Sequence, residues 1–250
     1  MTFEKIETPS LLVLGGCSDI GLAIAERFAK EGWLVMLAGR RRQALDAAAK
    51  AIQEKTGARV VSCFCDVEDL SSHRRFLAGQ EKLPDVVVSS VGFMQAQDAL
   101  DKDPVVAARV LSANFNGPAL LLHAIGKEMA LAGKGVIVGI SSVAGERGRG
   151  SNYLYGSAKA GFTAFLSGLR NKLHPSGVRV MTVLPGFVDT KMVADLDLPE
   201  KLTASPGQVA EAVWQGVEKG RDVVFVLPVW RLIMMIIRWI PESVFKKLSL

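Results

Sequence analysis

The most constraining feature of the sequence is an apolar run at residues 11–16 that ends in two glycines and leads into a helical pattern. Beyond the glycines, Ile20, Ala23, Ile24 and Phe28 recur at the spacing of successive helical turns. A strand, a tight turn and a helix in this order suit a dinucleotide, because glycines let the backbone approach a pyrophosphate and the helix N-terminus offers unpaired N–H groups. A plain strand-to-helix corner has the same pattern, so this feature gains meaning only from the rest of the chain.

Further apolar segments are interpreted as strands and alternate with helical segments along the whole chain. They lie at residues 33–38, 58–65, 84–91, 136–140, 178–184 and 222–227. A chain of 250 residues that is 49% hydrophobic has the size and core of a single α/β domain. We therefore expect a Rossmann-type, doubly wound parallel sheet of about seven strands with helices on both faces. Residues 1–228 would form this domain, and residues 229–250 an apolar and basic C-terminal extension of it.

The stretch 151–161 places a tyrosine and a lysine, Tyr155 and Lys159, four residues apart. On a helix these two side chains lie on the same face, one turn apart. A fixed ammonium close to a phenol stabilises the phenolate and lowers its pKa, which makes Tyr155 a candidate general acid. The same spacing recurs by chance in ordinary half-exposed helices, so it also needs support from its context.

That context resembles the short-chain dehydrogenase/reductase family over residues 10–227, in motifs that follow one another in the family's order. These are the glycine turn, Asn114, Ser142, Tyr155, Lys159 and Pro185-Gly186. The resemblance implies an NAD(P)-dependent oxidoreductase that reduces a ketone to a secondary alcohol. In it, Tyr155 protonates the substrate oxygen, while Lys159 lowers the pKa of Tyr155 and binds the nicotinamide ribose.

Two further catalytic residues follow from the same resemblance. Ser142 lies thirteen residues before Tyr155, the family spacing, which favours it over Ser141 as the group that orients the substrate carbonyl. Asn114 resembles the family's helix-kinking asparagine, whose backbone carbonyl holds a water that extends the proton relay from Lys159. The alternative is that Asn114 is only a polar helix residue.

The resemblance also implies a set of cofactor contacts, and the chain departs from the family pattern in two of them. Asp19 occupies the position of the middle glycine, where an acid must turn away from the phosphates or cap the helix. Residues 89–92 read Ser-Ser-Val-Gly instead of Asn-Asn-Ala-Gly. The implied contacts are Gly15, Ser18, Asp19, Ile20, Gly21, Arg40, Arg41, Asp66, Val67, Ser89, Gly92, Tyr155, Lys159, Pro185, Gly186, Val188 and Thr190.

The choice of cofactor depends on the end of the second strand, which carries arginines at residues 40–42 rather than an acid. An acidic residue there binds the ribose 2′-hydroxyl and repels a 2′-phosphate, whereas arginine accommodates the phosphate. Arg40 and Arg41 therefore favour NADP over NAD. The alternative is that the arginines only begin a solvated helix.

Composition points away from several other classes of protein. The 30 basic and 25 acidic residues are spread along the chain without the basic stripe of a nucleic-acid site. Cys63 and Cys65 would face opposite sides of one strand, which indicates neither a disulfide framework nor a metal site. The histidines lack metal-ligand spacing, so no metal is expected. The first ten residues contain no apolar signal segment, and we expect a cytoplasmic protein.

The C-terminal extension is rich in Ile, Met and Trp, with Arg231, Arg238, Lys246 and Lys247 interleaved. Its apolar stretch at residues 232–240 is shorter than the roughly 20 residues that span a bilayer. Three interpretations remain open: it lies against a membrane surface, it lines the way of a lipid substrate into the site, or it packs in an oligomer.

A closer resemblance concerns the tail pattern MMxxRxIPxSxFxKL, the Gly-Glu-Arg at residues 145–147 and the segment NxxYGSxKAG. These resemble the decaprenylphosphoryl-2-keto-ribose reductases of the family, which implies a polyprenyl-phosphoryl 2-keto-pentose as substrate, in cell-envelope sugar synthesis. It also implies a peripheral position at the inner face of the membrane. Family members are usually homodimers or homotetramers.

Alternatives to this function remain at two levels. Another lipidic or steroid-like ketone is the alternative substrate. A non-catalytic dinucleotide-binding sensor or scaffold is the alternative from another class, against which the intact Ser, Tyr and Lys argue. A membrane-associated structural protein would keep the tail but be indifferent to cofactor.

Overall fold

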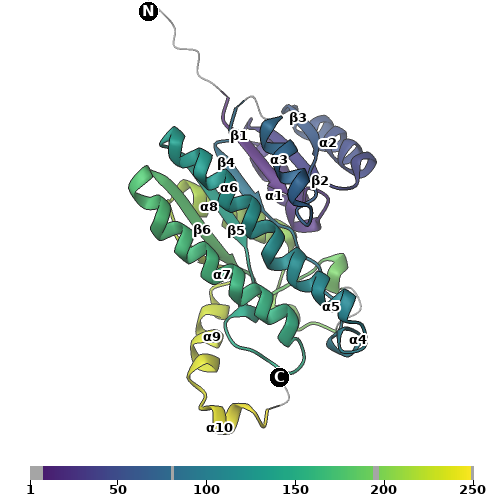
Figure 1. The fold of residues 1–250 in the computed structure, drawn as a ribbon, viewed down its shortest axis with the longest axis vertical. Helices are drawn as coiled ribbons and strands as arrows, with labels where there is room; N and C mark the ends of the chain where they lie inside the picture. The colour runs from purple at the N-terminus through teal and green to yellow at the C-terminus, as the bar shows by residue number, and fades with distance from the viewer. Residues whose placement is uncertain (1–7, 80–81, 194–196, 249–250) are drawn as a thin grey trace, which may run out of the picture.

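A computed structural model of the chain describes residues 8–79, 82–193 and 197–248. Its centre is a parallel sheet of seven strands in the order β3-β2-β1-β4-β5-β6-β9, which confirms the expected fold (Figure 1). The strands are β1 (Ser10–Leu14), β2 (Leu34–Gly39), β3 (Val60–Phe64), β4 (Val86–Ser89), β5 (Gly135–Ile140), β6 (Val178–Leu184) and β9 (Val223–Phe225). Short strands β7 (Phe187–Val188) and β8 (Thr203–Ala204) pair separately.

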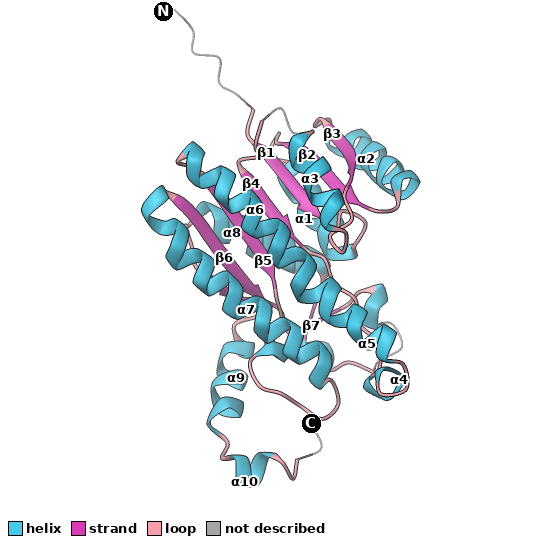
Figure 2. Ribbon diagram, viewed as in Figure 1, coloured by secondary structure: helices cyan, strands magenta, loops and turns pink. Residues whose placement is uncertain are grey.

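Helices cover both faces of the sheet (Figure 2). One face packs against α1 (Asp19–Ala29), α2 (Arg42–Thr56) and α8 (Pro206–Glu218). The other packs against α3 (Leu70–Ala78), α6 (Gly117–Ala132) and α7 (Tyr153–Leu173). Strand β1 shows why: Leu11 and Val13 belong to the first core and Leu12 and Leu14 to the second, because successive side chains of a strand point to opposite faces.

The strand register brings the carboxyl ends of β1, β2 and β4 together. Leu14 pairs with Ala38 on one side and with Ser89 on the other, so the residues just after these three strands meet at one edge of the sheet. The chain order reverses between β1 and β4, and open α/β sheets bind ligands at such a switch point.

The long helical run Pro104–Ala132, between β4 and β5, is interrupted. The structure has α5 (Pro104–Leu111), a π-helical turn η1 (Ser112–Asn116) and then α6. Within the described residues, the run Pro104–Ala132 is long and apolar enough to cross a bilayer. Here, however, α6 contributes Leu121, Leu122 and Ile125 to the core, which accounts for its apolar character.

The C-terminal extension folds back onto the carboxyl edge of the sheet as α9 (Val229–Trp239) and the short α10 (Glu242–Phe245). Trp230 and Met234 of α9 are buried with Val143 and Leu184 in a third apolar cluster. Figure 1 shows this yellow segment below α7, beyond the end of the sheet. The extension therefore lies on the side of the sheet where the motif residues gather.

Candidate active site

The glycine turn has the geometry that its sequence predicts. Gly15 has φ +83°, and a Cβ at Gly21 would lie 2.6 Å from the Gly15 carbonyl oxygen, so both positions require glycine. Ser18 caps α1: its hydroxyl accepts a hydrogen bond from the Gly21 N–H at 3.0 Å and donates to the Gly15 carbonyl at 2.8 Å.

Asp19, at the position of the family's middle glycine, turns away from this cradle. Its carboxylate accepts a hydrogen bond from the Lys191 backbone N–H at 2.9 Å and lies 3.9 Å from the Lys191 ammonium. Ser18 caps the helix, so Asp19 does not. Of the two outcomes expected for Asp19, its side chain therefore follows the first and turns away from the glycine turn. The glycine turn is thereby joined to the segment that follows β7.

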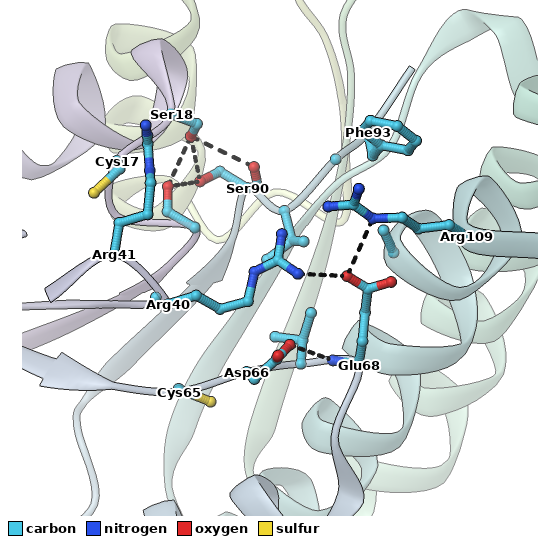
Figure 3. A pocket seen from close by; sticks show the side chains of 16 residues that line it. Cys17, Ser18, Arg40, Arg41, Cys65, Asp66, Glu68, Ser90, Phe93 and Arg109 are labelled. Atoms are coloured by element: carbon cyan, nitrogen blue, oxygen red, sulfur yellow. Dashed lines mark hydrogen bonds and ion pairs between the residues drawn. The ribbon is translucent and has the colours of Figure 1, made fainter. Parts of the chain in front are cut away.

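A pocket of about 310 Å³ opens beside the glycine turn at the switch point of the sheet (Figure 3). Seven of the predicted cofactor contacts line it: Gly15, Ser18, Arg40, Arg41, Asp66, Val67 and Gly92. The backbone at Gly15 leaves no room for a side chain, since a Cβ there would lie 3.0 Å from the Ser90 carbonyl carbon. A glycine-lined cradle, a capped helix N-terminus and an arginine wall fit a dinucleotide.

Three arginines line one wall of the pocket: Arg40, Arg41 and Arg109. The same wall includes a carboxylate, Glu68, that the sequence analysis did not single out. In Figure 3, Arg40 and Arg109 approach Glu68 from opposite sides; Arg40 Nη1 lies 2.9 Å and Arg109 Nε 3.8 Å from Glu68 Oε2. The Arg109 guanidinium also lies 4.4 Å from the centre of the Phe93 ring. Arg41 is exposed in the same pocket and forms no ion pair with any residue that the structure describes.

The two serines at the end of β4, Ser89 and Ser90, differ from the predicted contacts: Ser90, not Ser89, lines the pocket. Ser90 lines the pocket, and its hydroxyl donates to the Leu14 carbonyl at 3.1 Å and lies 3.1 Å from the Ser18 hydroxyl. The buried Ser89 hydroxyl, named as a contact, has no hydrogen-bond partner among the described residues. Ser90 therefore supplies the hydrogen bonds that tie β4 to the glycine turn.

Ser142 and Tyr155 meet at the end of β5. The Tyr155 hydroxyl hydrogen-bonds the Ser142 side chain, and the Ser142 oxygen also accepts from the Ala144 N–H at 3.1 Å. Ser141 faces the other way, donating to the Lys159 carbonyl at 3.0 Å and lying 2.6 Å from the Thr163 hydroxyl. Ser142, and not Ser141, therefore lies beside the Tyr155 hydroxyl.

The direction of the Tyr155 pKa shift differs from the sequence expectation. Burial raises the pKa of the Tyr155 phenol to about 12, opposed in part by the hydrogen bond with Ser142. Burial also lowers the pKa of the Lys159 ammonium to about 8. Lys159 Nζ lies 5.7 Å from the centre of the Tyr155 ring and donates to the Ile140 carbonyl at 3.2 Å. Burial is the larger of these two effects on the phenol, so the Tyr155 pKa moves upward rather than downward.

Asn114 lies in the π-helical turn η1, fully buried. Its amide nitrogen donates to the Val110 carbonyl at 2.9 Å and the Phe93 carbonyl at 2.5 Å, and its oxygen accepts from the Phe93 N–H at 3.3 Å. A Cβ at Gly92 would lie 3.3 Å from the Asn114 oxygen and 3.9 Å from Lys159 Nζ. Gly92 thus joins the pocket to the Tyr155 and Lys159 helix.

The remaining predicted contacts do not line the pocket. Ile20 packs against the core, and Val188 is buried in it. Gly186 faces the extension: a Cβ there would lie 1.9 Å from Trp230 Cε2. Pro185 holds the end of β5, accepting from the Val143 N–H at 3.0 Å, while Thr190 accepts from the Val193 N–H at 3.1 Å. Among the residues that the structure describes, no group of three or more His, Cys, Asp or Glu is placed to hold a metal.

Fold and site together define an NAD(P)-dependent oxidoreductase, and the comparisons with known proteins agree. The sequence pattern of the short chain dehydrogenase family matches residues 10–201, and the chain belongs to that family. An uncharacterized oxidoreductase of Streptomyces coelicolor is 38% identical over 96% of this chain and 95% of its own length. A 3-oxoacyl-[acyl-carrier-protein] reductase of Chlamydia trachomatis is 32% identical over 74% of this chain and 76% of its own.

Solved structures show the same fold. A short-chain dehydrogenase from Sphingobium yanoikuyae, in complex with NADPH, superimposes with a TM-score of 0.80 at 24% identity, covering 94% of this chain and 97% of that one. A second short chain dehydrogenase/reductase family protein gives a TM-score of 0.78 at 30% identity, covering 89% of this chain and 97% of its own.

Proposed function

We propose that the protein reduces a ketone carbonyl to a secondary alcohol and uses NADPH in preference to NADH. The observation that carries this proposal is the group of Ser142, Tyr155 and Lys159 at the carboxyl edge of the sheet. Gly92 links this group to the glycine-lined pocket. A binding module would need the pocket alone, which argues against a sensor or scaffold.

A nicotinamide cofactor held in the pocket would supply the hydride. The Ser142 hydroxyl orients the substrate oxygen, and the Tyr155 hydroxyl, hydrogen-bonded to Ser142, delivers a proton to that oxygen as negative charge develops on it. With a pKa of about 12, Tyr155 holds its proton at neutral pH, as a general acid for reduction must. Lys159 returns a proton toward Tyr155, and Asn114 holds the relay in place from the π-helical turn.

The preference for NADPH rests on Arg41. Its guanidinium is exposed at the pocket wall, without an ion pair in the described part of the chain. Arg40, by contrast, is held by Glu68 at 2.9 Å. A free guanidinium suits a 2′-phosphate, because an arginine fork matches phosphate oxygens geometrically.

For the substrate, we propose a polyprenyl-phosphoryl 2-keto-pentose. Supporting it is the outer face of α9, where Leu232, Met235, Ile236 and Trp239 are exposed as a stripe beside the basic Arg231 and Arg238. Such a face suits a lipid chain or the surface of an anionic membrane at the cytoplasmic side. The alternative substrate is another lipidic ketone. The similarity to a 3-oxoacyl-[acyl-carrier-protein] reductase supports this alternative. A homodimer or homotetramer is expected by family.

The test of this proposal is a substrate comparison with NADPH and NADH at equal concentrations. We expect NADPH oxidation with the polyprenyl-phosphoryl 2-keto-pentose and a much lower kcat/KM with the same keto-sugar lacking its lipid. Equal kcat/KM for the two sugars would contradict a lipid-linked substrate. Turnover only with a 3-oxoacyl thioester would transfer the assignment to the alternative ketone.

A further inference from the structure

A second cavity lies away from the cofactor pocket, between the C-terminal extension and the loop that leads into α7. It measures about 230 Å³, and its walls are Gly148, Arg149 and Gly150 from the loop with Glu242, Phe245, Lys246 and Leu248 from the extension. A site needs about 10–15 Å³ of such volume to hold one water, so this cavity has room for a group larger than a water molecule. A Cβ at Gly148 or Gly150 would have no heavy atom within 4 Å apart from those of its chain neighbours, so this side of the cavity is open.

We call this second cavity the extension pocket. Two of the charged side chains around it, Arg147 and Glu242, already form an ion pair with each other. Arg147 Nη2 binds the Glu242 carboxylate at 2.7 Å, and Arg147 Nη1 donates to the Ile237, Arg238 and Ile240 carbonyls at 3.2, 3.1 and 2.8 Å. The Arg147 guanidinium also lies 4.0 Å from the centre of the Phe245 ring. Arg147 therefore clamps the end of α9 to α10, and Glu242, the acidic residue in the pocket wall, is neutralised by it.

Two positive charges in the pocket wall are left over. Lys246 is exposed, and neither Lys246 nor Arg149 forms an ion pair with a residue that the structure describes. Arg149 is half-buried; its Nη2 lies 3.9 Å from Met234 Sδ of α9, a weak contact for a guanidinium. Among the residues that the structure describes, no carboxylate forms an ion pair with this arginine or this lysine.

Without a ligand, the burial of the Arg149 guanidinium should lower the stability of the folded protein. Its Nε is buried and has no hydrogen-bond partner among the described residues. Burial also lowers the pKa of this guanidinium, because the charged form loses solvation without gaining a counter-charge. Buried donors in native proteins are otherwise almost always paired, so an unpaired one beside an open cavity indicates a missing acceptor.

We propose that the extension pocket binds a phosphate ester, held between the guanidinium of Arg149 and the ammonium of Lys246. The planar fork of an arginine and the point charge of a lysine are the pair of donors that phosphate oxygens accept. Such an ester has two sources: a water-soluble phosphate ester or the headgroup of an anionic lipid. The exposed apolar stripe of α9 belongs to the same C-terminal extension, so an acyl chain on the phosphate would find an apolar surface on that extension.

The proposal is tested by binding to the full-length protein, with no ketone or turnover involved, so its outcome is independent of the proposed reductase activity. One arm titrates glycerol 3-phosphate by calorimetry; the other measures co-sedimentation with phosphatidylcholine vesicles that contain or lack phosphatidylglycerol. Binding of glycerol 3-phosphate identifies a water-soluble source. Binding only to vesicles with phosphatidylglycerol identifies a lipid headgroup.

Variants assign the binding to the pocket. Arg149→Gln and Lys246→Gln should each weaken whichever probe binds by about tenfold or more, since each removes a charge-assisted hydrogen bond. Lys247→Gln is the matched control: it removes the same charge one residue away, outside the pocket wall, and should change binding by less than about twofold.

Gly148→Asp adds a carboxylate on the open side of the pocket and leaves Arg149 in the sequence, and it should abolish binding even if Arg149→Gln fails to fold. The proposal is overturned if neither probe binds the wild type, or if Lys247→Gln weakens binding as much as Lys246→Gln.

Discussion

The reaction requires the ammonium of Lys159, but burying this charge should lower the stability of the folded protein. Lys159 is 3% exposed, and burial lowers its pKa from 10.5 to about 8. At 1.36 kcal/mol for each pKa unit, holding the charged form in the folded state costs about 3 kcal/mol at neutral pH. Lys159→Met removes the charge and keeps most of the volume, but it also removes the 3.2 Å hydrogen bond to the Ile140 carbonyl. That bond is worth about 1 kcal/mol, so we expect a net stabilisation of about 2 kcal/mol.

The pH dependence identifies the cause. Below pH 8 the lysine is charged in both the folded and the unfolded protein, and the full cost is present. As the pH rises from 8 through 10.5, the folded protein loses the proton first, and the cost disappears. Urea unfolding at pH 7 and pH 10 should therefore show a stability advantage of the variant at pH 7 that is lost at pH 10.

The exposed Lys172→Met, on the same helix, is the control and should alter the free energy of unfolding by less than about 0.5 kcal/mol at either pH. A Lys159→Met variant that is less stable than wild type at pH 7, or equally advantaged at both pH values, would refute the reasoning.

Three further predictions concern the cofactor pocket and the extension. Asp19→Gly removes a negative charge beside the cradle and its contact with the segment after β7, so NADPH should bind about two- to fivefold more tightly in a fluorescence titration; weaker binding would contradict this. Arg41→Gln should raise the Kd for NADPH about tenfold and leave that for NADH unchanged, whereas Arg42→Gln, outside the pocket wall, should change neither; a parallel loss for both cofactors would count against a 2′-phosphate contact. Trp230→Ala should lower the free energy of unfolding by about 3–5 kcal/mol because this side chain is 4% exposed, while Leu232→Ala on the exposed face should cost less than about 1 kcal/mol; equal losses would contradict the packing of α9.

The sheet could be predicted because its strands are continuous apolar runs. Strand β6 has the bounds expected for it, and β1 places alternate side chains in two cores, as a parallel strand buried on both faces must. The position of Ser142 also followed from the sequence, since its spacing to Tyr155 is fixed by one strand end and one helix start. Each of these features depends on residues close together in the sequence, so a local sequence pattern is enough to predict it.

What could not be predicted depends on contacts between distant segments. Asp19 and Lys191 are 172 residues apart, and no local pattern joins them. Glu68 and Arg109 reach the pocket from after β3 and from α5, so their charges meet only once the sheet is formed. The direction of the Tyr155 pKa differs from the sequence expectation because burial, which a motif does not report, raises it.

The most direct test of the central claim is the rate of NADPH oxidation by purified wild-type protein, Tyr155→Phe and Tyr153→Phe with a polyprenyl-phosphoryl 2-keto-pentose. Tyr153 lies on the same helix but is 45% exposed and bonded to Asp101 at 2.6 Å, which makes its variant the matched control. General acid catalysis contributes about 10² to 10⁴-fold, so kcat should fall by that factor in Tyr155→Phe and stay near wild type in Tyr153→Phe. Turnover by Tyr155→Phe at the wild-type rate, with NADPH bound, would contradict the assignment of this residue as the acid.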